Sequence, residues 1–174
     1  PIPAAGEGAG VSRVFDQAMH TAPTWKDVDW LVRQTRLPVF VKGILHPDDA
    51  ARAVETGAAG VVVSNHGGRV LDTAPAALHA LPAVAARLNG AVPILLDSGI
   101  RRGADAFKAI ALGATAVMVG RPYIHALAVA GALGVAHLLR TLREELEITM
   151  ALTGCARLAD ITADHLWRGP ESPT

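Results

Sequence analysis

A short segment with the sequence SNHGGR, residues 64–69, carries the side chains best suited to chemistry. Its imidazole, His66, and its guanidinium, Arg69, lie three residues apart, just after the apolar run Gly60–Val63. A histidine titrates near neutral pH and can take a proton from a bound substrate. An arginine fork can hold a carboxylate, and the two glycines between these residues permit a tight turn. We therefore predict that His66 is a base and Arg69 a carboxylate clamp; the alternative is a buried, hydrogen-bonded turn histidine.

Two further segments have the character of an anion site. The segments 97–103 (DSGIRRG) and 119–122 (VGRP) each lead from an apolar run through small residues to a predicted helix. Glycine lets backbone N–H groups approach a phosphate, and a helix N-terminus favours negative charge. Arg101 and Arg121 can add bidentate hydrogen bonds. These two loops are predicted to bind a phosphate group.

Lys42 ends another apolar run, so its ammonium is expected at the same edge of the fold. There it could form a Schiff base, pair with a carboxylate or stabilise a developing anion. A purely structural ion pair is the simpler alternative. The remaining histidines lack the spacing of metal ligands, so no metal site is expected.

Alternating strands and helices must position these residues. The strands are continuous apolar runs, which indicates burial on both faces, as in a parallel sheet covered by helices. Prolines at helix starts and glycines at helix ends mark the boundaries. The predicted strands are 38–42, 60–65, 93–97 and 115–119. A first helix is predicted to start near Thr24, and five more are predicted at 47–55, 75–88, 104–112, 122–132 and 135–152.

An internal repeat defines the architecture. Residues 38–44 match 93–100, and 57–63 match 113–119, with one extra residue near Ser98. Two βαβα copies make a (βα)4 unit, and a TIM (β/α)8 barrel needs eight strands and about 250 residues. Phosphate sites in such barrels follow the last two strands, so the fold class predicted is α/β, the C-terminal (βα)4 half of a TIM barrel. It would be completed by a missing N-terminal segment, which could be another chain, a cleaved segment or a second copy.

The composition excludes some partners. The 174 residues include 16 basic and 16 acidic ones, so the formal net charge is zero. That balance argues against nucleic acid and anionic membranes as partners, and the apolar runs are too short to predict a membrane segment. A single cysteine, Cys155, suits a reducing compartment, so a cytoplasmic location is expected.

The motifs taken together closely resemble the FMN-dependent 2-hydroxy-acid oxidase and dehydrogenase family, which includes glycolate oxidase, lactate oxidase and mandelate dehydrogenase. The resemblance extends over about residues 24–168. It rests on the order and spacing of VKGI (41–44), SNHGGR (64–69), DSGIRRG (97–103), ALGA (111–114), VGRP (119–122) and TMALTGC (149–155).

This resemblance implies FMN as the cofactor and a role for each motif residue. His66 would be the catalytic base, in contact with the substrate, and Arg69 would bind the substrate carboxylate. Lys42 would stabilise the reduced flavin, Ser64 would contact its ring system, and Asp97 would hold the ribityl chain. The remaining cofactor-binding residues would be Ser98, where many family members have glycine, together with Gly99, Arg101, Gly120 and Arg121.

The implied reaction is the oxidation of a 2-hydroxy acid to a 2-keto acid. The alanine-rich, arginine-over-lysine composition suggests mandelate or 4-hydroxymandelate as the substrate. Residues 1–22 would be the remnant of a mobile active-site lid, residues 23–168 the half-barrel and residues 169–174 a tail. The family's other barrel half supplies an aspartate and tyrosines, so this chain alone is expected to be inactive. A homotetramer is also expected.

Two alternatives stay open. Another FMN- or phosphate-binding TIM-barrel enzyme would share the phosphate loops but would not need His66 and Arg69 together. An enzyme of this kind related to IMP dehydrogenase would need a cysteine nucleophile in a loop of the active site. Cys155, the one cysteine, follows a predicted helix and is in the wrong place for that role. A non-catalytic half-barrel fragment would instead associate through its open sheet edges.

Overall fold

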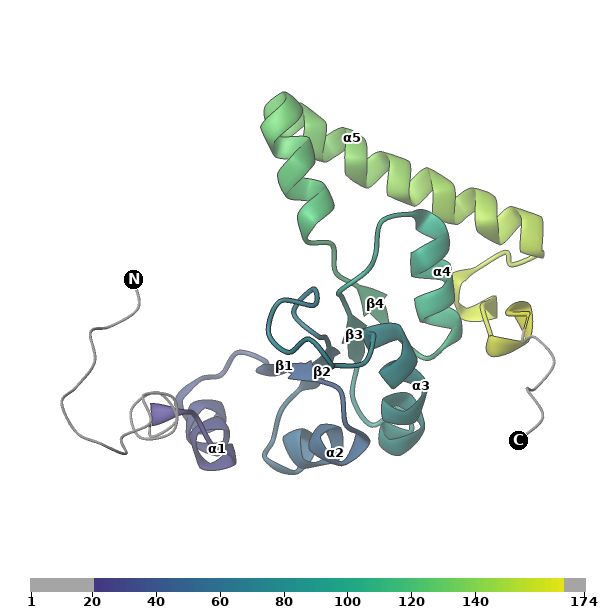
Figure 1. Cartoon of the computed structure of the whole chain (residues 1–174). Helices are drawn as coiled ribbons and strands as arrows, with labels where there is room; N and C mark the ends of the chain where they lie inside the picture. Colours follow the sequence, from purple (N-terminus) through teal and green to yellow (C-terminus); the bar gives the residue numbers. More distant parts are fainter. Residues whose placement is uncertain (1–20, 168–174) are drawn as a thin grey trace.

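The chain folds around a four-stranded parallel sheet (Figure 1). This computed structural model describes residues 21–167. The strands lie in the order β1-β2-β3-β4, and each pairs in parallel with the next. The predicted lid, residues 1–22, lies outside the described residues except for its last two positions, and so does the predicted tail, 169–174. The strands are β1 (Phe40–Ile44), β2 (Gly60–Val63), β3 (Ile94–Leu96) and β4 (Ala116–Val117).

Helices connect successive strands, as the alternating pattern predicts. Helices α2, α3 and α4 cross over between strands, α1 precedes the sheet and α5 follows it (Figure 1). The main core forms where these crossover helices meet the sheet, around side chains such as Val61, Leu81 and Leu96. The helices are α1 (Trp25–Gln34), α2 (Pro47–Glu55), α3 (Ala77–Leu88), α4 (Gly103–Ala111) and α5 (Arg121–Thr153), and two short 3₁₀ turns, Leu158–Asp160 and Ala163–His165, follow.

Helix boundaries agree closely with the sequence prediction, and strand boundaries agree less well. Helix α2 has the predicted bounds, with Pro47 at its first position. Strand β2 is buried along its whole length, whereas β1 and β4 are partly exposed. The predicted burial on both faces is therefore seen in full for β2 and not for β1 and β4, which are the two edge strands of the sheet.

Helix α5 is two helices joined by a break. Ala130 (φ −145°) and Gly131 (φ 57°) leave helical geometry, close to where the sequence predicts the boundary between two helices. By length and composition the whole of α5 could cross a membrane. The first part, which ends before Ala130, is too short to cross a hydrocarbon core of about 30 Å. The second part carries exposed ion pairs between Arg140 and Glu144 and between Arg143 and Glu147.

The second part of α5 is fixed to the start of α4. The backbone N–H of Gly103 donates to Oε2 of Glu145 at 2.7 Å, and a Cβ atom at Gly103 would collide with the backbone at Leu146.

Candidate functional site

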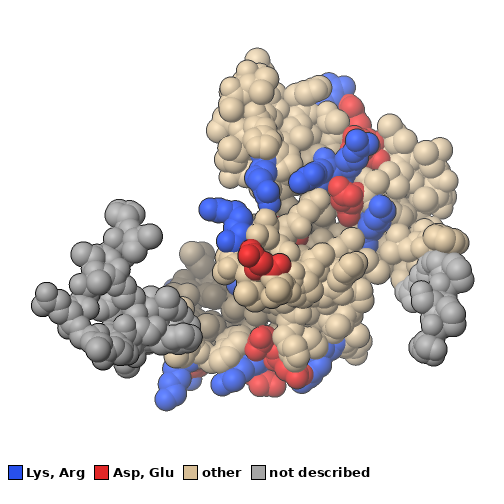
Figure 2. All heavy atoms as spheres, in the orientation of Figure 1, with Lys and Arg blue, Asp and Glu red and all other residues tan. Residues whose placement is uncertain are grey.

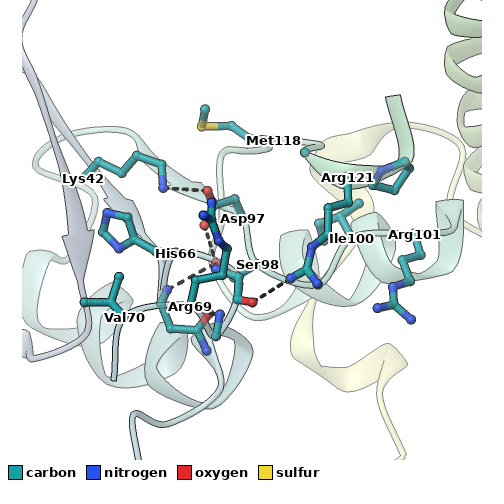
Figure 3. A pocket seen from close by; sticks show the side chains of 16 residues that line it. Lys42, His66, Arg69, Val70, Asp97, Ser98, Ile100, Arg101, Met118 and Arg121 are labelled. Atoms are coloured by element: carbon teal, nitrogen blue, oxygen red, sulfur yellow. Dashed lines mark hydrogen bonds and ion pairs between the residues drawn. The ribbon is translucent and has the colours of Figure 1, made fainter. Parts of the chain in front are cut away.

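A cavity of about 700 Å³ opens at the carboxyl ends of the four strands (Figure 3). Its volume is within the range of small-molecule and cofactor sites. The strand ends that the sequence predicts to carry the chemistry therefore converge on one space. The predicted site residues that line it are Lys42, His66, Arg69, Asp97, Ser98, Gly99, Arg101, Gly120 and Arg121.

Positive charge dominates the cavity wall. Four lining side chains are cations, and Asp97 is the one carboxylate among the lining residues. Within residues 21–167, the guanidinium groups of Arg69 and Arg101 have no hydrogen-bond or ion-pair partner. Lys and Arg side chains also gather between α5 and the body of the molecule in the space-filling view (Figure 2). Such a surface is suited to a ligand with at least one anionic group.

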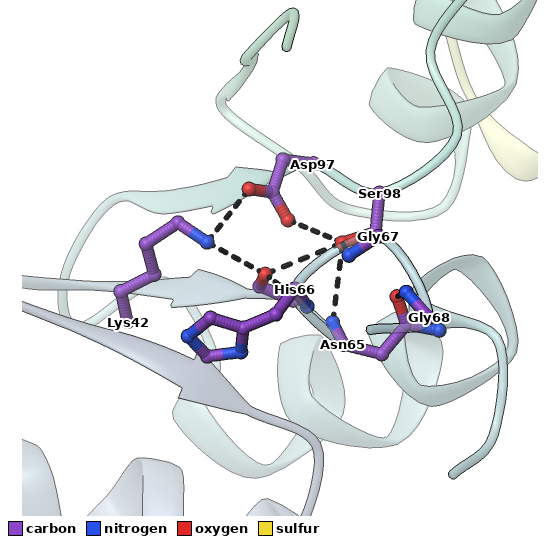
Figure 4. Close-up of polar contacts among 8 residues, drawn as sticks. Lys42, Asn65, His66, Gly67, Gly68, Asp97 and Ser98 are labelled. Atoms are coloured by element: carbon purple, nitrogen blue, oxygen red, sulfur yellow. Dashed lines mark hydrogen bonds and ion pairs between the residues drawn. The ribbon is translucent and has the colours of Figure 1, made fainter. Parts of the chain in front are cut away.

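Three successive strand ends meet in one polar network (Figure 4). The Lys42 Nζ atom lies 2.8 Å from the Asp97 carboxylate and donates to the Ser64 hydroxyl at 2.8 Å. Partial burial favours the neutral form of Asp97. Hydrogen bonds from Lys42 and from two serine hydroxyls, together with the Lys42 charge, outweigh that effect and hold the pKa of Asp97 below its ordinary value. Lys42 thus has the carboxylate partner that the sequence left as one of several possibilities.

The turn after β2 has an unusual backbone. His66 (φ 56°), Gly67 (φ 73°) and Gly68 (φ 71°) are three consecutive residues in the left-handed region. A non-glycine residue there costs about 1–2 kcal/mol, so His66 is held against its backbone preference. Asn65 closes the turn, because its Oδ1 accepts from the Gly68 N–H and its Nδ2 donates to the Pro75 carbonyl.

This turn presents the His66 ring to the cavity. The side chain is exposed, and its ring makes no hydrogen bond with the part of the chain that the structure describes. Figures 3 and 4 both show it beside Lys42. The alternative of a buried, hydrogen-bonded turn histidine is therefore wrong. The ring is available for proton transfer with a ligand in the cavity.

Gly43 is a site residue that the sequence reasoning did not single out. It lies at an irregularity in the pairing of β1 with β2 and has φ +98°. A Cβ atom built there would lie 2.8 Å from Cε1 of His66, so the ring occupies the space that a side chain would need. The signal that could have found it is a glycine directly after the apolar run of the predicted strand 38–42, because glycines at such places mark bulges and close approaches.

Both predicted phosphate loops contact the turn that carries His66, the loop 119–122 through Arg121 and the loop 97–103 through Ser98. One Nη2 hydrogen bond, 2.6 Å long, joins Arg121 to the Gly67 carbonyl. Around Gly99 and Gly120, no atom lies within 4 Å of where a side chain would begin, so both backbones are open to a ligand. With the Arg101 and Arg121 side chains nearby, this is the donor set that a phosphate group requires.

Ser64 is the one predicted site residue that does not line the cavity. It is fully buried beneath the cavity wall, where its hydroxyl contacts Lys42, the His66 N–H and Ser98. Its direct contact with a flavin ring stays a prediction. In residues 21–167, no group of three or more His, Cys, Asp or Glu side chains forms a metal-binding cluster.

Fold and site define a parallel α/β protein whose cavity is lined by cations and glycine-containing loops and carries a histidine–arginine pair. Comparison with known proteins gives the family: residues 4–168 match the family described as FMN-dependent dehydrogenase, and the chain belongs to it. FMN, the cofactor expected from the motifs, is the cofactor of this family.

Curated relatives share high identity over most of this chain. An L-lactate oxidase of Alicycliphilus denitrificans is 59% identical over 95% of this chain and 46% of its own length. A peroxisomal (S)-2-hydroxyacid oxidase of Arabidopsis thaliana is 49% identical over 92% of this chain and 44% of its own length. The chain thus spans less than half the length of these relatives.

Solved structures agree with the half-barrel. A lactate oxidase from Pediococcus acidilactici superposes with a TM-score of 0.80 and 45% identity, over 86% of this chain and 43% of that one. A mandelate oxidase variant superposes with a TM-score of 0.77 and 50% identity, over 79% of this chain and 44% of the mandelate oxidase chain. These oxidases are TIM barrels, and the predicted fold class, half of such a barrel, is confirmed.

Proposed function

We propose that this chain is the cofactor-binding and catalytic half of an enzyme that oxidises a 2-hydroxy acid to a 2-keto acid. The observation that carries the proposal is the presence of His66 and Arg69 in one cavity with Lys42 and the phosphate loops. Bound FMN would supply the two-electron acceptor. Arg101 and Arg121 would hold its phosphate, and Lys42 would favour negative charge at the reduced ring.

His66 and Arg69 would divide the work on the substrate. The unpaired Arg69 fork would bind the carboxylate and fix the orientation of the α-carbon. His66 would take the proton that leaves the substrate, the hydroxyl proton or the α-proton, and would become positively charged. Asp97 already pairs with Lys42, so the carboxylate that balances a charged His66 would come from the other half of the barrel.

Lactate or glycolate is a better first candidate for the substrate than mandelate. Relatives named L-lactate oxidase are 59%, 57% and 52% identical to this chain, and two from rice named glycolate oxidase are 54% identical. The mandelate suggestion from composition has support in the mandelate oxidase structures at 50% identity. Both classes share the 2-hydroxy-carboxylate group that His66 and Arg69 would recognise.

The activity would require the N-terminal half of the same barrel. Strands β1 and β4 each have a free edge within the described residues, and together these edges could accept four more parallel strands. We use the term complete barrel for this chain together with that half. The homotetramer and the cytoplasmic location stay predictions.

The decisive experiment uses the complete barrel loaded with FMN and kept anaerobic. We expect L-lactate or glycolate to bleach the flavin absorbance, with (S)-mandelate as the third compound tested. The chain alone should give no bleaching. If none of a panel of 2-hydroxy acids reduces the flavin, the proposed function is wrong, even though the family and fold stand.

Replacing Arg69 with lysine is expected to raise KM and lower kcat together, by about tenfold each, because an ammonium cannot reproduce a bidentate fork. Steady-state kinetics with the best substrate would measure this. Arg143→Lys, on the exposed face of α5, is the matched control and should leave both constants unchanged. Unchanged kinetics in Arg69→Lys would move the carboxylate site elsewhere.

The Lys42–Asp97 pair should make stability depend on acid pH. Since the pKa of Asp97 is lowered on folding, its contribution is complete above the ordinary carboxyl pKa and is lost as pH falls through the folded value. Asp97→Asn should therefore flatten the fall in thermal unfolding midpoint between about pH 5 and pH 3. Asp72→Asn, an exposed carboxyl outside the network, is the control. An identical slope in the parent and in Asp97→Asn would contradict this assignment.

A further inference from the structure

Ser98 has a hydrogen-bonding role that its place in a phosphate loop does not explain. Its hydroxyl donates to Oδ1 of Asp97 at 2.7 Å (Figure 4). The same oxygen accepts from the backbone N–H of Asn65 at 3.2 Å and from that of Gly67 at 3.0 Å. The side chain thus points to the turn that carries His66, on a different strand end from its own.

The hydrogen bonds that Ser98 accepts satisfy backbone N–H groups of the left-handed turn. The His66 N–H between those two donates to the Ser64 hydroxyl at 3.1 Å, so two serine oxygens satisfy three successive backbone N–H groups. A left-handed run cannot satisfy these groups by helix or sheet pairing, and an unpaired donor is costly where water is excluded. Ser98 supplies the acceptor for two of the three.

The donated hydrogen bond fixes how the hydroxyl is oriented. Because its proton is directed to Asp97, its lone pairs face the turn. Asp97 in turn holds Lys42, whose ammonium lies in the same cavity. One hydroxyl therefore joins the turn that carries the candidate base to the ion pair beside it.

The backbone of Ser98 adds to this argument. Its φ of +69° is in the region that favours glycine, so a serine is held there against its preference. Glycine would adopt the conformation more readily but would have no hydroxyl. The hydroxyl is thus the part of the residue that the site uses.

We propose that Ser98 is a positioning residue, whose hydroxyl fixes the His66 turn relative to the Lys42–Asp97 pair. This inference rests on the proposed function for the role of His66. It assigns the Ser98 side chain to the turn of the base, while its neighbour Gly99 offers backbone to the phosphate.

The first test is amide hydrogen exchange in the FMN-free complete barrel, compared between the parent and the variants Ser98→Gly and Ser98→Ala. We expect the Asn65 and Gly67 amides to exchange at least about tenfold faster in the Gly and Ala variants, which lack the hydroxyl. The β2 amides, which pair with neighbouring strands, serve as internal references.

Glycine fits the backbone at this position, so Ser98→Gly should fold, and its result is decisive. Unchanged exchange at Asn65 and Gly67 in both Ser98→Gly and Ser98→Ala would overturn the proposal. This readout needs neither flavin nor substrate, so it stands even if the proposed function fails.

The second test separates positioning from cofactor binding. In the FMN-loaded complete barrel, Ser98→Gly should slow flavin reduction about tenfold, with the Kd values for FMN and substrate within about twofold of the parent, since a misplaced base affects the chemical step. A weaker FMN affinity with an unchanged reduction rate would instead make Ser98 a cofactor-binding residue and overturn the positioning role.

Discussion

Replacement of His66 by glutamine in the complete barrel is expected to leave FMN bound and to slow flavin reduction at least ~100-fold, the usual scale for loss of a general base. Glutamine keeps a polar side chain of similar reach but cannot take up a proton at neutral pH. FMN affinity should be maintained because the phosphate loops follow other strands. Anaerobic stopped-flow absorbance would give the reduction rate, and fluorescence titration would give the FMN affinity.

His79→Gln on α3 is the matched control, since His79 is exposed and does not line the cavity. It should reduce flavin at the parent rate. A His66→Gln variant that also does so would remove His66 from the role of base. A His66→Gln variant that loses FMN altogether would contradict the expectation that FMN affinity depends on the phosphate loops and not on this turn.

Gly43→Ala is expected to give the second large effect, a loss of about 100-fold in the reduction rate. The new Cβ atom would lie 2.8 Å from the His66 ring, so the ring must move, and a displacement of about 1 Å from productive geometry can cost that much. The pH profile of reduction should change along with the rate, because the ring would enter a new environment beside Lys42. Stopped-flow reduction across pH would measure both.

Gly90→Ala separates collision from backbone strain. Gly90 also has a left-handed φ, +76°, but no atom lies within 4 Å of where its side chain would begin. Both variants should lose a similar amount of stability from the backbone, about 1 kcal/mol, and only Gly43→Ala should lose the reduction rate. Equal reduction rates in the two variants would contradict the contact between Gly43 and His66 as a constraint on catalysis.

The sequence predicts the order of elements well because each boundary has a local physical cause. Pro47 starts α2 because its fixed φ suits the first turn of a helix. Asn89 and Gly90 end α3 because they adopt left-handed conformations there. Strand β1 is shifted by two residues from its predicted range, and β2, β3 and β4 are shorter than theirs. Strand length depends on a neighbour to pair with, and β4 has one only on the side of β3.

The sequence was enough to predict which residues form the candidate site, but it was not enough to predict how those residues contact one another. His66, Arg69 and the arginines of the phosphate loops are recognisable because their chemistry is in their side chains. Gly43 matters for the side chain that it lacks, and Ser64 and Ser98 matter for hydroxyls that join strand ends 22 to 34 residues apart. No local pattern encodes such distant contacts, so the structure is needed to find them.

The ion pair between Lys42 and Asp97 has a further meaning when it is placed on the internal repeat. The two residues occupy equivalent positions, each following the apolar core of a copy that begins at Pro38 or at Pro93. Two identical copies would bring two like charges to the same buried hydroxyl, at a considerable electrostatic cost. The two copies of the repeat are therefore not interchangeable at this position: one carries the cation that faces the cavity, and the other carries its counter-ion.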